Sequence, residues 1–172
     1  MHSFAELVDR STAFTLSALS DAAERTFEAL QTSAATPLVK TLQMIQLQKA
    51  ILAVGMFSMF EAILQDGLGC NDGFREAKSI LRASGQEALA ERFHDFQLAT
   101  NVLKHGRGRS YDALVAKAAG LPFRIKLPGE VFFFEGDVSE IATLVEVDDR
   151  FVLSCADVVW KVSEAIRTAR PG

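Results

Sequence analysis

Reactive and metal-binding side chains are scarce in this chain. Its 172 residues include two cysteines, three histidines, one tryptophan and one tyrosine. Cys70 and Cys155 lie far apart in the sequence, which fits neither a zinc motif nor a disulfide framework, so we expect two reduced thiols and no metal. The chain also lacks a phosphate-binding glycine loop, a Gly-x-Ser-x-Gly motif and a His-Glu-x-x-His motif. The sequence therefore gives no sign of a cofactor or of these common catalytic centres.

Strong net charge and very long hydrophobic runs are missing as well. The formal net charge is only −4, so the chain as a whole does not attract nucleic acid, and any anion site must be a local patch. The N-terminus does not have the pattern of a signal peptide. The most apolar run, residues 50–60, is too short for a bilayer, which needs roughly 20 apolar residues. These absences predict a cytoplasmic protein that does not enter a membrane.

What the chain has in abundance is apolar residues at helical spacing. Hydrophobic residues make up 49% of the sequence, enough for a packed core. Residues 121–147 differ, because Phe123–Leu127 alternates apolar and charged side chains and Val131–Phe134 is rich in β-formers. We expect a small hairpin or an irregular excursion there. Helices are predicted over residues 3–31, 38–67, 73–83, 86–105, 110–117 and 149–169. Ser110 is a candidate N-terminal cap of the helix over residues 110–117.

This pattern predicts an all-α protein with a single domain over residues 1–172. Residues 38–169 would form a four-helix-type bundle, and residues 1–31 a long helix that joins the bundle or serves as a dimerisation arm. We expect a homodimer, because the apolar second helix and the phenylalanine-rich excursion offer more hydrophobic surface than a small bundle can cover.

The most informative segment is residues 101–109, where a helical stretch meets a glycine break. It contains Asn101, Lys104, His105, Arg107 and Arg109. Histidine titrates near neutral pH, and arginine presents a permanent charge in a fork that fits phosphate or carboxylate. The segment could therefore bind an anion and move a proton beside it. It could equally be a solvated helix end, since cations are favoured at a helix C-terminus.

The same segment resembles the signature of the HEPN superfamily, whose members are small α-helical bundles and in many cases RNases. That signature is an arginine, a polar residue, three further residues and a histidine. Asn101 matches the polar position and His105 the histidine, while Thr100 stands in place of the arginine. The resemblance covers residues 38–168. It implies that His105 and Asn101 are the catalytic pair of any RNase site, usually one formed across a dimer.

Because Thr100 replaces the arginine, the resemblance implies a non-catalytic interaction or regulatory module that could bind RNA, a nucleotide or a protein partner. The alternative is a metal-independent RNase of a toxin–antitoxin or phage-defence system, so catalysis stays open. Lys104, Arg107 and Arg109 would contact phosphate in either case. An arginine restored at position 100 would be expected to raise cleavage.

Three other charged positions complete the candidate residues. Glu61, a lone charge in an apolar helix, could orient His105 or pair with Lys104, or it could lie at an exposed edge. Arg92 precedes His105 by thirteen residues, roughly 20 Å along one helix, too far to share a phosphate with it. His94 is also too far from His105 to share a metal ion with it.

Overall fold

The computed structural model describes residues 3–33, 35–130 and 143–170. In these ranges the protein is all helical, apart from turns and one isolated β-bridge. The α-helices are α1 (Phe4–Leu30), α2 (Thr36–Leu68), α3 (Gly73–Ala83), α4 (Glu87–His105), α5 (Arg109–Ala116) and α6 (Asp149–Ala169), and one 3-10 turn, η1, covers Ala118–Gly120. Each predicted helix is confirmed, with its ends within two residues of the observed ones.

Local sequence explains where several of these helices begin. The side chain of Ser3 accepts a hydrogen bond from the Glu6 backbone at the start of α1, and Asp148 does the same for Phe151 at the start of α6. Pro37 occupies the first turn of α2, where a missing backbone N–H costs nothing. Ser110 is not a cap as its sequence position suggested, because α5 begins one residue earlier and follows Gly108.

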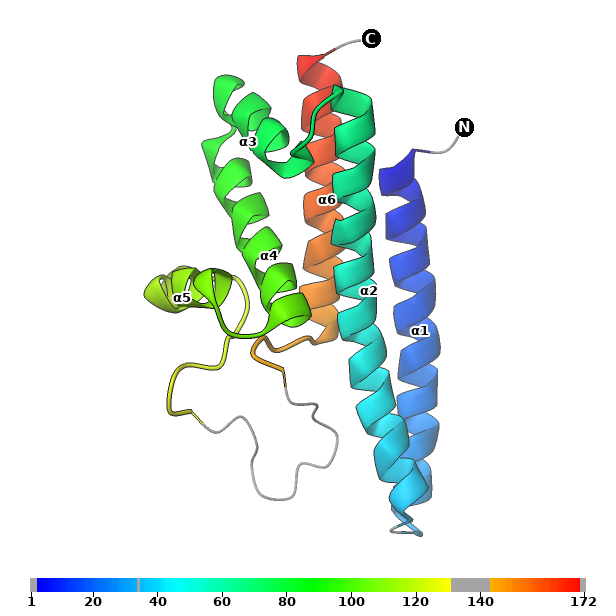
Figure 1. Cartoon of the computed structure of the whole chain (residues 1–172). Helices are drawn as coiled ribbons and strands as arrows, with labels where there is room; N and C mark the ends of the chain where they lie inside the picture. Colours follow the sequence, from blue (N-terminus) through cyan, green and yellow to red (C-terminus); the bar gives the residue numbers. More distant parts are fainter. Residues whose placement is uncertain (1–2, 34, 131–142, 171–172) are drawn as a thin grey trace.

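Four long helices lie side by side, and α6 packs against α1, α2, α3 and α4 (Figure 1). The N-terminal helix α1 contacts both α2 and α6, and its Val8 and Leu16 belong to the same core as the other helices. Helices α1 and α2 form a long antiparallel pair that extends beyond the start of α6 (Figure 1).

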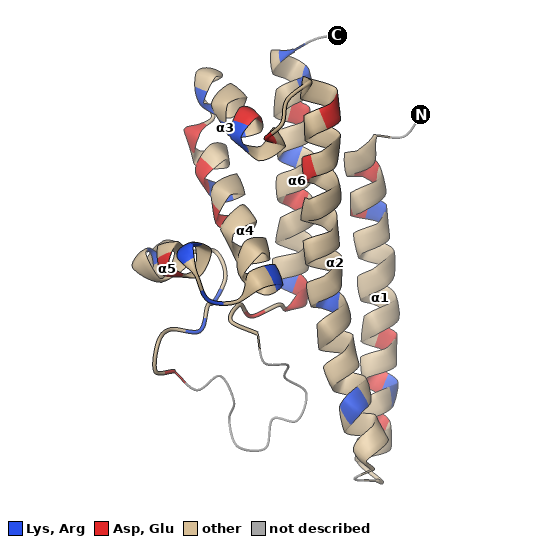
Figure 2. Cartoon of the chain, viewed as in Figure 1, with Lys and Arg blue, Asp and Glu red and all other residues tan. Residues whose placement is uncertain are grey.

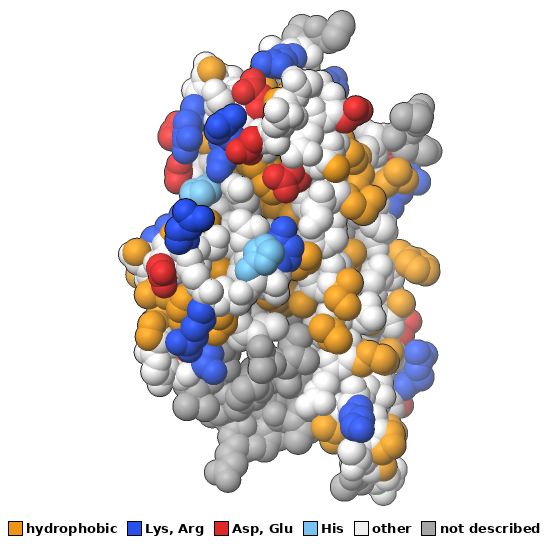
Figure 3. All heavy atoms as spheres, viewed as in Figure 1, with side chains coloured by type: hydrophobic (Ala, Val, Ile, Leu, Met, Phe, Trp, Pro, Cys, Tyr) orange, Lys and Arg blue, Asp and Glu red, His pale blue; other side chains and the backbone are white. Residues whose placement is uncertain are grey.

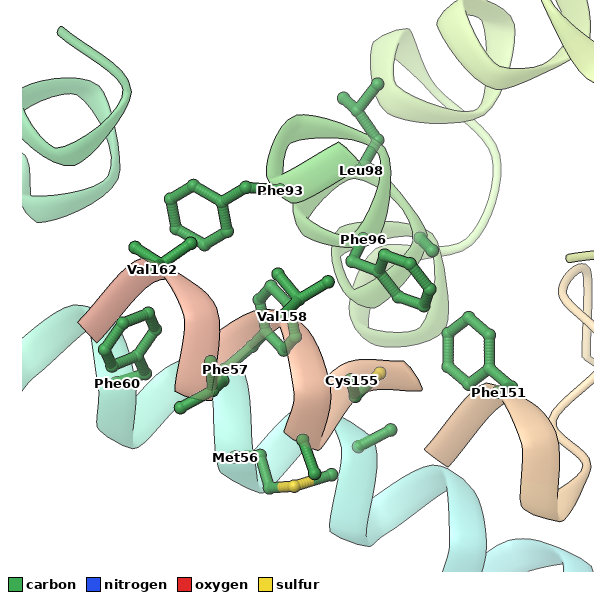
Figure 4. Packing of buried hydrophobic residues seen from close by; sticks show 14 of the residues in the cluster. Met56, Phe57, Phe60, Phe93, Phe96, Leu98, Phe151, Cys155, Val158 and Val162 are labelled. Atoms are coloured by element: carbon green, nitrogen blue, oxygen red, sulfur yellow. The ribbon is translucent and has the colours of Figure 1, made fainter. Parts of the chain in front are cut away.

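Aromatic side chains from different helices meet in the centre of the core. Phe93 of α4 lies 5.2 Å from Phe74 of α3 and about 6 Å from Phe57 and Phe60 of α2, measured between ring centroids. Edge-to-face and tilted pairs of this kind add to the stabilisation from apolar burial. Figure 4 shows the rings of Phe57, Phe60 and Phe93 beside Val158 and Val162 of α6. The hydrophobic spacing of the sequence therefore corresponds to one continuous core.

The excursion before α6 forms little regular structure where it is described. Ile125 and Val145 form an antiparallel bridge, and the Lys126 N–H donates to the Leu144 carbonyl at 3.0 Å. No longer strand occurs among the residues described. Val131–Phe134, the β-prone part of the expected hairpin, lies outside them.

Candidate functional site

The candidate site forms where α4 ends and the chain turns into α5. Gly106 has φ 72° and ψ −141°, a conformation that side chains with a Cβ rarely adopt, and its N–H donates to the Val102 carbonyl at 2.8 Å. The glycine thus stops α4 directly after His105. Three residues later α5 begins at Arg109, so the chain reverses within a short turn.

The turn encloses an open depression of about 290 Å³. Asn101 and His105 lie one helical turn apart on α4 and both line it. Asn101 is half-buried, whereas His105 is exposed to solvent. The full lining consists of Asn101, His105, Gly106, Arg107, Gly108, Arg109 and Ser110.

Positive charge is concentrated around this depression. Lys104, His105, Arg107 and Arg109 are exposed, and in the part of the chain that is described none of them forms an ion pair. Figure 2 shows Lys and Arg at the end of α4 and along the turn into α5. Free N–H groups at the start of α5 add a partial positive charge on the same side. A phosphate or carboxylate would be stabilised here by several donors at once.

The scaffold behind the depression is anchored at both ends of α5. The guanidinium of Arg107 lies over the ring of Tyr111, 5.7 Å from the ring centre. The hydroxyl of Tyr111 donates to the Lys126 carbonyl at 2.5 Å, and Lys117 forms an ion pair with Asp95 of α4. The Lys117–Asp95 pair holds α5 against α4, and the Tyr111 hydrogen bond ties α5 to the excursion that follows it.

Thr100 does not face the depression. Its side chain is only 2% exposed, and its hydroxyl donates to the backbone carbonyls of Phe96 and Gln97, both at 3.0 Å. The position at which the HEPN signature has arginine therefore points into the core. This burial revises the expectation that an arginine at position 100 would supply a guanidinium to the site.

Arg92 and Glu61 lie apart from the turn. Arg92 pairs with Asp157 of α6 at 3.2 Å and is thirteen residues from His105 on the same helix, which agrees with the long separation expected. The Glu61 carbonyl lies 2.8 Å from the place a Cβ would occupy on Gly73, so Glu61 sits against the start of α3. Among the described residues no hydrogen bond or ion pair joins the Glu61 side chain to Lys104 or His105.

Sequence reasoning did not find a second polar cluster, which joins α3 to α4. The Lys78 ammonium donates to Gln97 at 2.8 Å and lies 3.2 Å from Nδ1 of His94. Burial lowers the pKa of Lys78, and burial together with the Lys78 charge lowers the pKa of His94. Sixteen residues separate the two basic side chains, so only the packing of two helices brings them together.

The His94 environment predicts a loss of stability in mild acid. Because its pKa in the folded protein is below the unfolded value of about 6.5, the unfolded chain binds a proton more readily. The contribution of neutral His94 to the free energy of unfolding is fully present above that pH and is lost as the pH falls through 6.5 toward the folded pKa. We expect His94→Gln to reduce the fall in urea midpoint between pH 7.5 and 5, measured by circular dichroism. The control is His105→Gln, which replaces an exposed histidine on the same helix and should leave that fall unchanged. An equal effect of both changes would contradict the assignment of the acid sensitivity to His94.

Metal and thiol chemistry find little support in the described residues. No group of three or more His, Cys, Asp or Glu side chains among them could hold a metal ion. Cys70 and Cys155 are both free, and complete burial raises the pKa of the Cys155 thiol well above its usual value. Cys155 is therefore a packing residue of α6.

Comparison with protein-family models, with curated proteins and with solved structures gives no match to this chain.

Proposed function

We propose that the protein is a HEPN-like helical interaction module that binds phosphate groups of RNA at the turn between α4 and α5. The observation that supports this most is that His105, Arg107 and Arg109 line one open depression beside the exposed Lys104, with no carboxylate paired to any of them in the described residues. A phosphate backbone satisfies such a group better than a carboxylate would, because successive phosphates can contact separate cations. His105 and Asn101 then serve as hydrogen-bond donors to the bound nucleotide.

Binding without cleavage follows from the position of Thr100. RNA cleavage at such a site would need a cation close to the charge that develops on the phosphorane. The arginine of the HEPN signature has that role in the family that this segment resembles. Here that position is buried and uncharged. Arg107 and Arg109 can hold a phosphate at the rim, which suits a regulatory or binding role.

The test is the salt dependence of RNA binding. Binding is measured by the fluorescence anisotropy of a short labelled single-stranded RNA. Loss of two phosphate contacts in the Arg107→Gln/Arg109→Gln variant should flatten the slope of log affinity against log salt by about 1.4. The control variant Arg25→Gln/Lys40→Gln removes the same charge from exposed positions on α1 and α2 and should keep the slope of the wild type. Competition with ATP distinguishes a nucleotide site from an RNA site.

Two results would reject this function. One is the absence of salt-dependent RNA binding in the wild type, and the other is an equal loss in the control variant. Displacement of RNA by ATP at far lower concentration than by unlabelled RNA would replace RNA with a nucleotide as the ligand.

The metal-independent RNase of a toxin–antitoxin or phage-defence system is the second candidate. This candidate is supported by the positions of Asn101 and His105, which lie one helical turn apart and line the same depression as Arg107 and Arg109. In this case RNA should be cut in the presence of a chelator, and His105→Ala should abolish the cleavage. Cleavage that survives His105→Ala would exclude the depression as its source.

A further inference from the structure

A long apolar face on α1 and α2 remains uncovered in the single chain. Figure 3 shows hydrophobic side chains spread over these two helices. Phe14 is 77% exposed and Ile51 53% exposed, values unusual for large apolar residues in a protein of this size. The α1–α2 apolar face consists of Leu7, Phe14, Met44, Leu47, Ile51, Met59 and Ile63.

The apolar character of α2 exceeds what its own fold uses. An 18-residue window of this helix has a mean hydropathy of 1.5, yet only 33% of that window is buried. No charged residue occurs between Lys49 and Glu61. The side of α2 that packs in the core is apolar as expected, and the opposite side is apolar too.

Gly55 lies in the middle of this apolar stretch of α2. A Cβ placed on it would meet no atom within 4 Å. Glycine in a helix interior costs about 1 kcal/mol relative to alanine, and its missing side chain leaves room here for a second backbone to approach closely. Ile51, Gly55, Met59 and Ile63 follow one another at steps of four residues, and such a row allows two helices to cross at about −50°.

We propose that the α1–α2 apolar face is the interface of a homodimer, in which α2 crosses α2 of a second copy at Gly55. The central α2 part of this face, residues 50–60, carries no charge, so it is compatible with its own copy, as a two-fold interface requires, and offers no charge to select an oppositely charged partner. Its seven large side chains are about half exposed, which gives on the order of 700 Å² per chain, close to the roughly 800 Å² per partner of a stable interface. Gly55 would lie next to the two-fold axis, where the two backbones approach most closely.

The oligomeric state of the full chain tests the proposal, measured by size-exclusion chromatography with light scattering at about 10 µM, where a dimer of typical affinity is formed. The wild type should have twice the 18.8 kDa mass of one chain. Ile51→Lys should weaken the dimer roughly 30-fold or more, because it buries an unpaired charge at the centre of the interface. Leu153→Lys is the matched control, since Leu153 is 51% exposed but lies on α6, and it should remain dimeric. Circular dichroism shows that both variants are folded.

Cross-linking tests the position of the axis. In a Cys70→Ser background, Gly55→Cys should form a disulfide between two chains under mild oxidation, which requires Cα atoms within roughly 7 Å. Leu153→Cys in the same background should not. A monomeric wild type, or a dimer that Ile51→Lys leaves intact, would overturn the proposal. A monomer that sediments with neutral phosphatidylcholine vesicles would assign the face to a lipid surface instead, and a dimer without the Gly55 cross-link would overturn the crossing at this residue.

Discussion

Thr100→Arg is expected to destabilise the fold severely and to add no RNase activity. The side chain at this position is 2% exposed and lies on the core side of α4. An arginine there would bring a charge into an apolar environment with no carboxylate to pair with, which costs several kcal/mol. A domain of this size has only about 5–15 kcal/mol of unfolding free energy, so a large part of it would be lost.

Urea unfolding followed by circular dichroism measures this effect. Ala88→Arg is the control, because it places the same side chain at an exposed position on α4 and should change the midpoint little. A Thr100→Arg variant as stable as the wild type would show that the arginine reaches solvent. If that variant also cut RNA, position 100 would face the site after all, as the HEPN resemblance implies.

Phe93→Ala should remove about 3–5 kcal/mol from the free energy of unfolding. Phe93 is fully buried and its ring contacts rings from α2 and α3, so a cavity would open where three helices meet. The rigid backbones of these helices limit how far the neighbours can move to fill it.

Thermal and urea unfolding of Phe93→Ala should both shift to lower midpoints. Leu153→Ala removes an exposed apolar side chain outside the α1–α2 apolar face and should change the free energy of unfolding by less than about 0.5 kcal/mol. Similar losses for the two variants would mean that the core around Phe93 repacks easily. The comparison separates burial from hydrophobicity, since both residues are large and apolar.

Most of the helical architecture could be predicted, because its signals are local. The apolar spacing of residues 149–169 and the acidic cap at Asp148 lie within one stretch of chain, and each determines its helix without reference to the rest. The prediction failed at Ser110, where two nearby glycines allow the helix to begin earlier than a polar cap would suggest. It was incomplete for residues 121–147, since a single bridge depends on contacts between Ile125 and Val145, twenty residues apart in sequence.

The candidate site was predicted in part for the same reason. Asn101, His105 and the arginines are neighbours in sequence, so their common location at the end of α4 follows from helix geometry and one glycine. The possible contact of Glu61 with Lys104 or His105 depended on how α2 packs against α4, which no local pattern determines. In the structure the Glu61 backbone lies beside Gly73 at the start of α3. The Lys78–His94 pair had no signal at all, because no spacing rule links α3 with α4.

By itself, the sequence determined an all-helical protein with its positive charge gathered at one helix end and with an unusually apolar second helix. These are properties of short windows, where period, caps and glycines act directly on the backbone. Only the tertiary structure decided that Thr100 is buried while its half-buried neighbour Asn101 lines the depression, and that one side of α2 stays uncovered. Both depend on how each helix is rotated about its axis, which is decided by packing against the other helices because burial of apolar area outweighs any local preference.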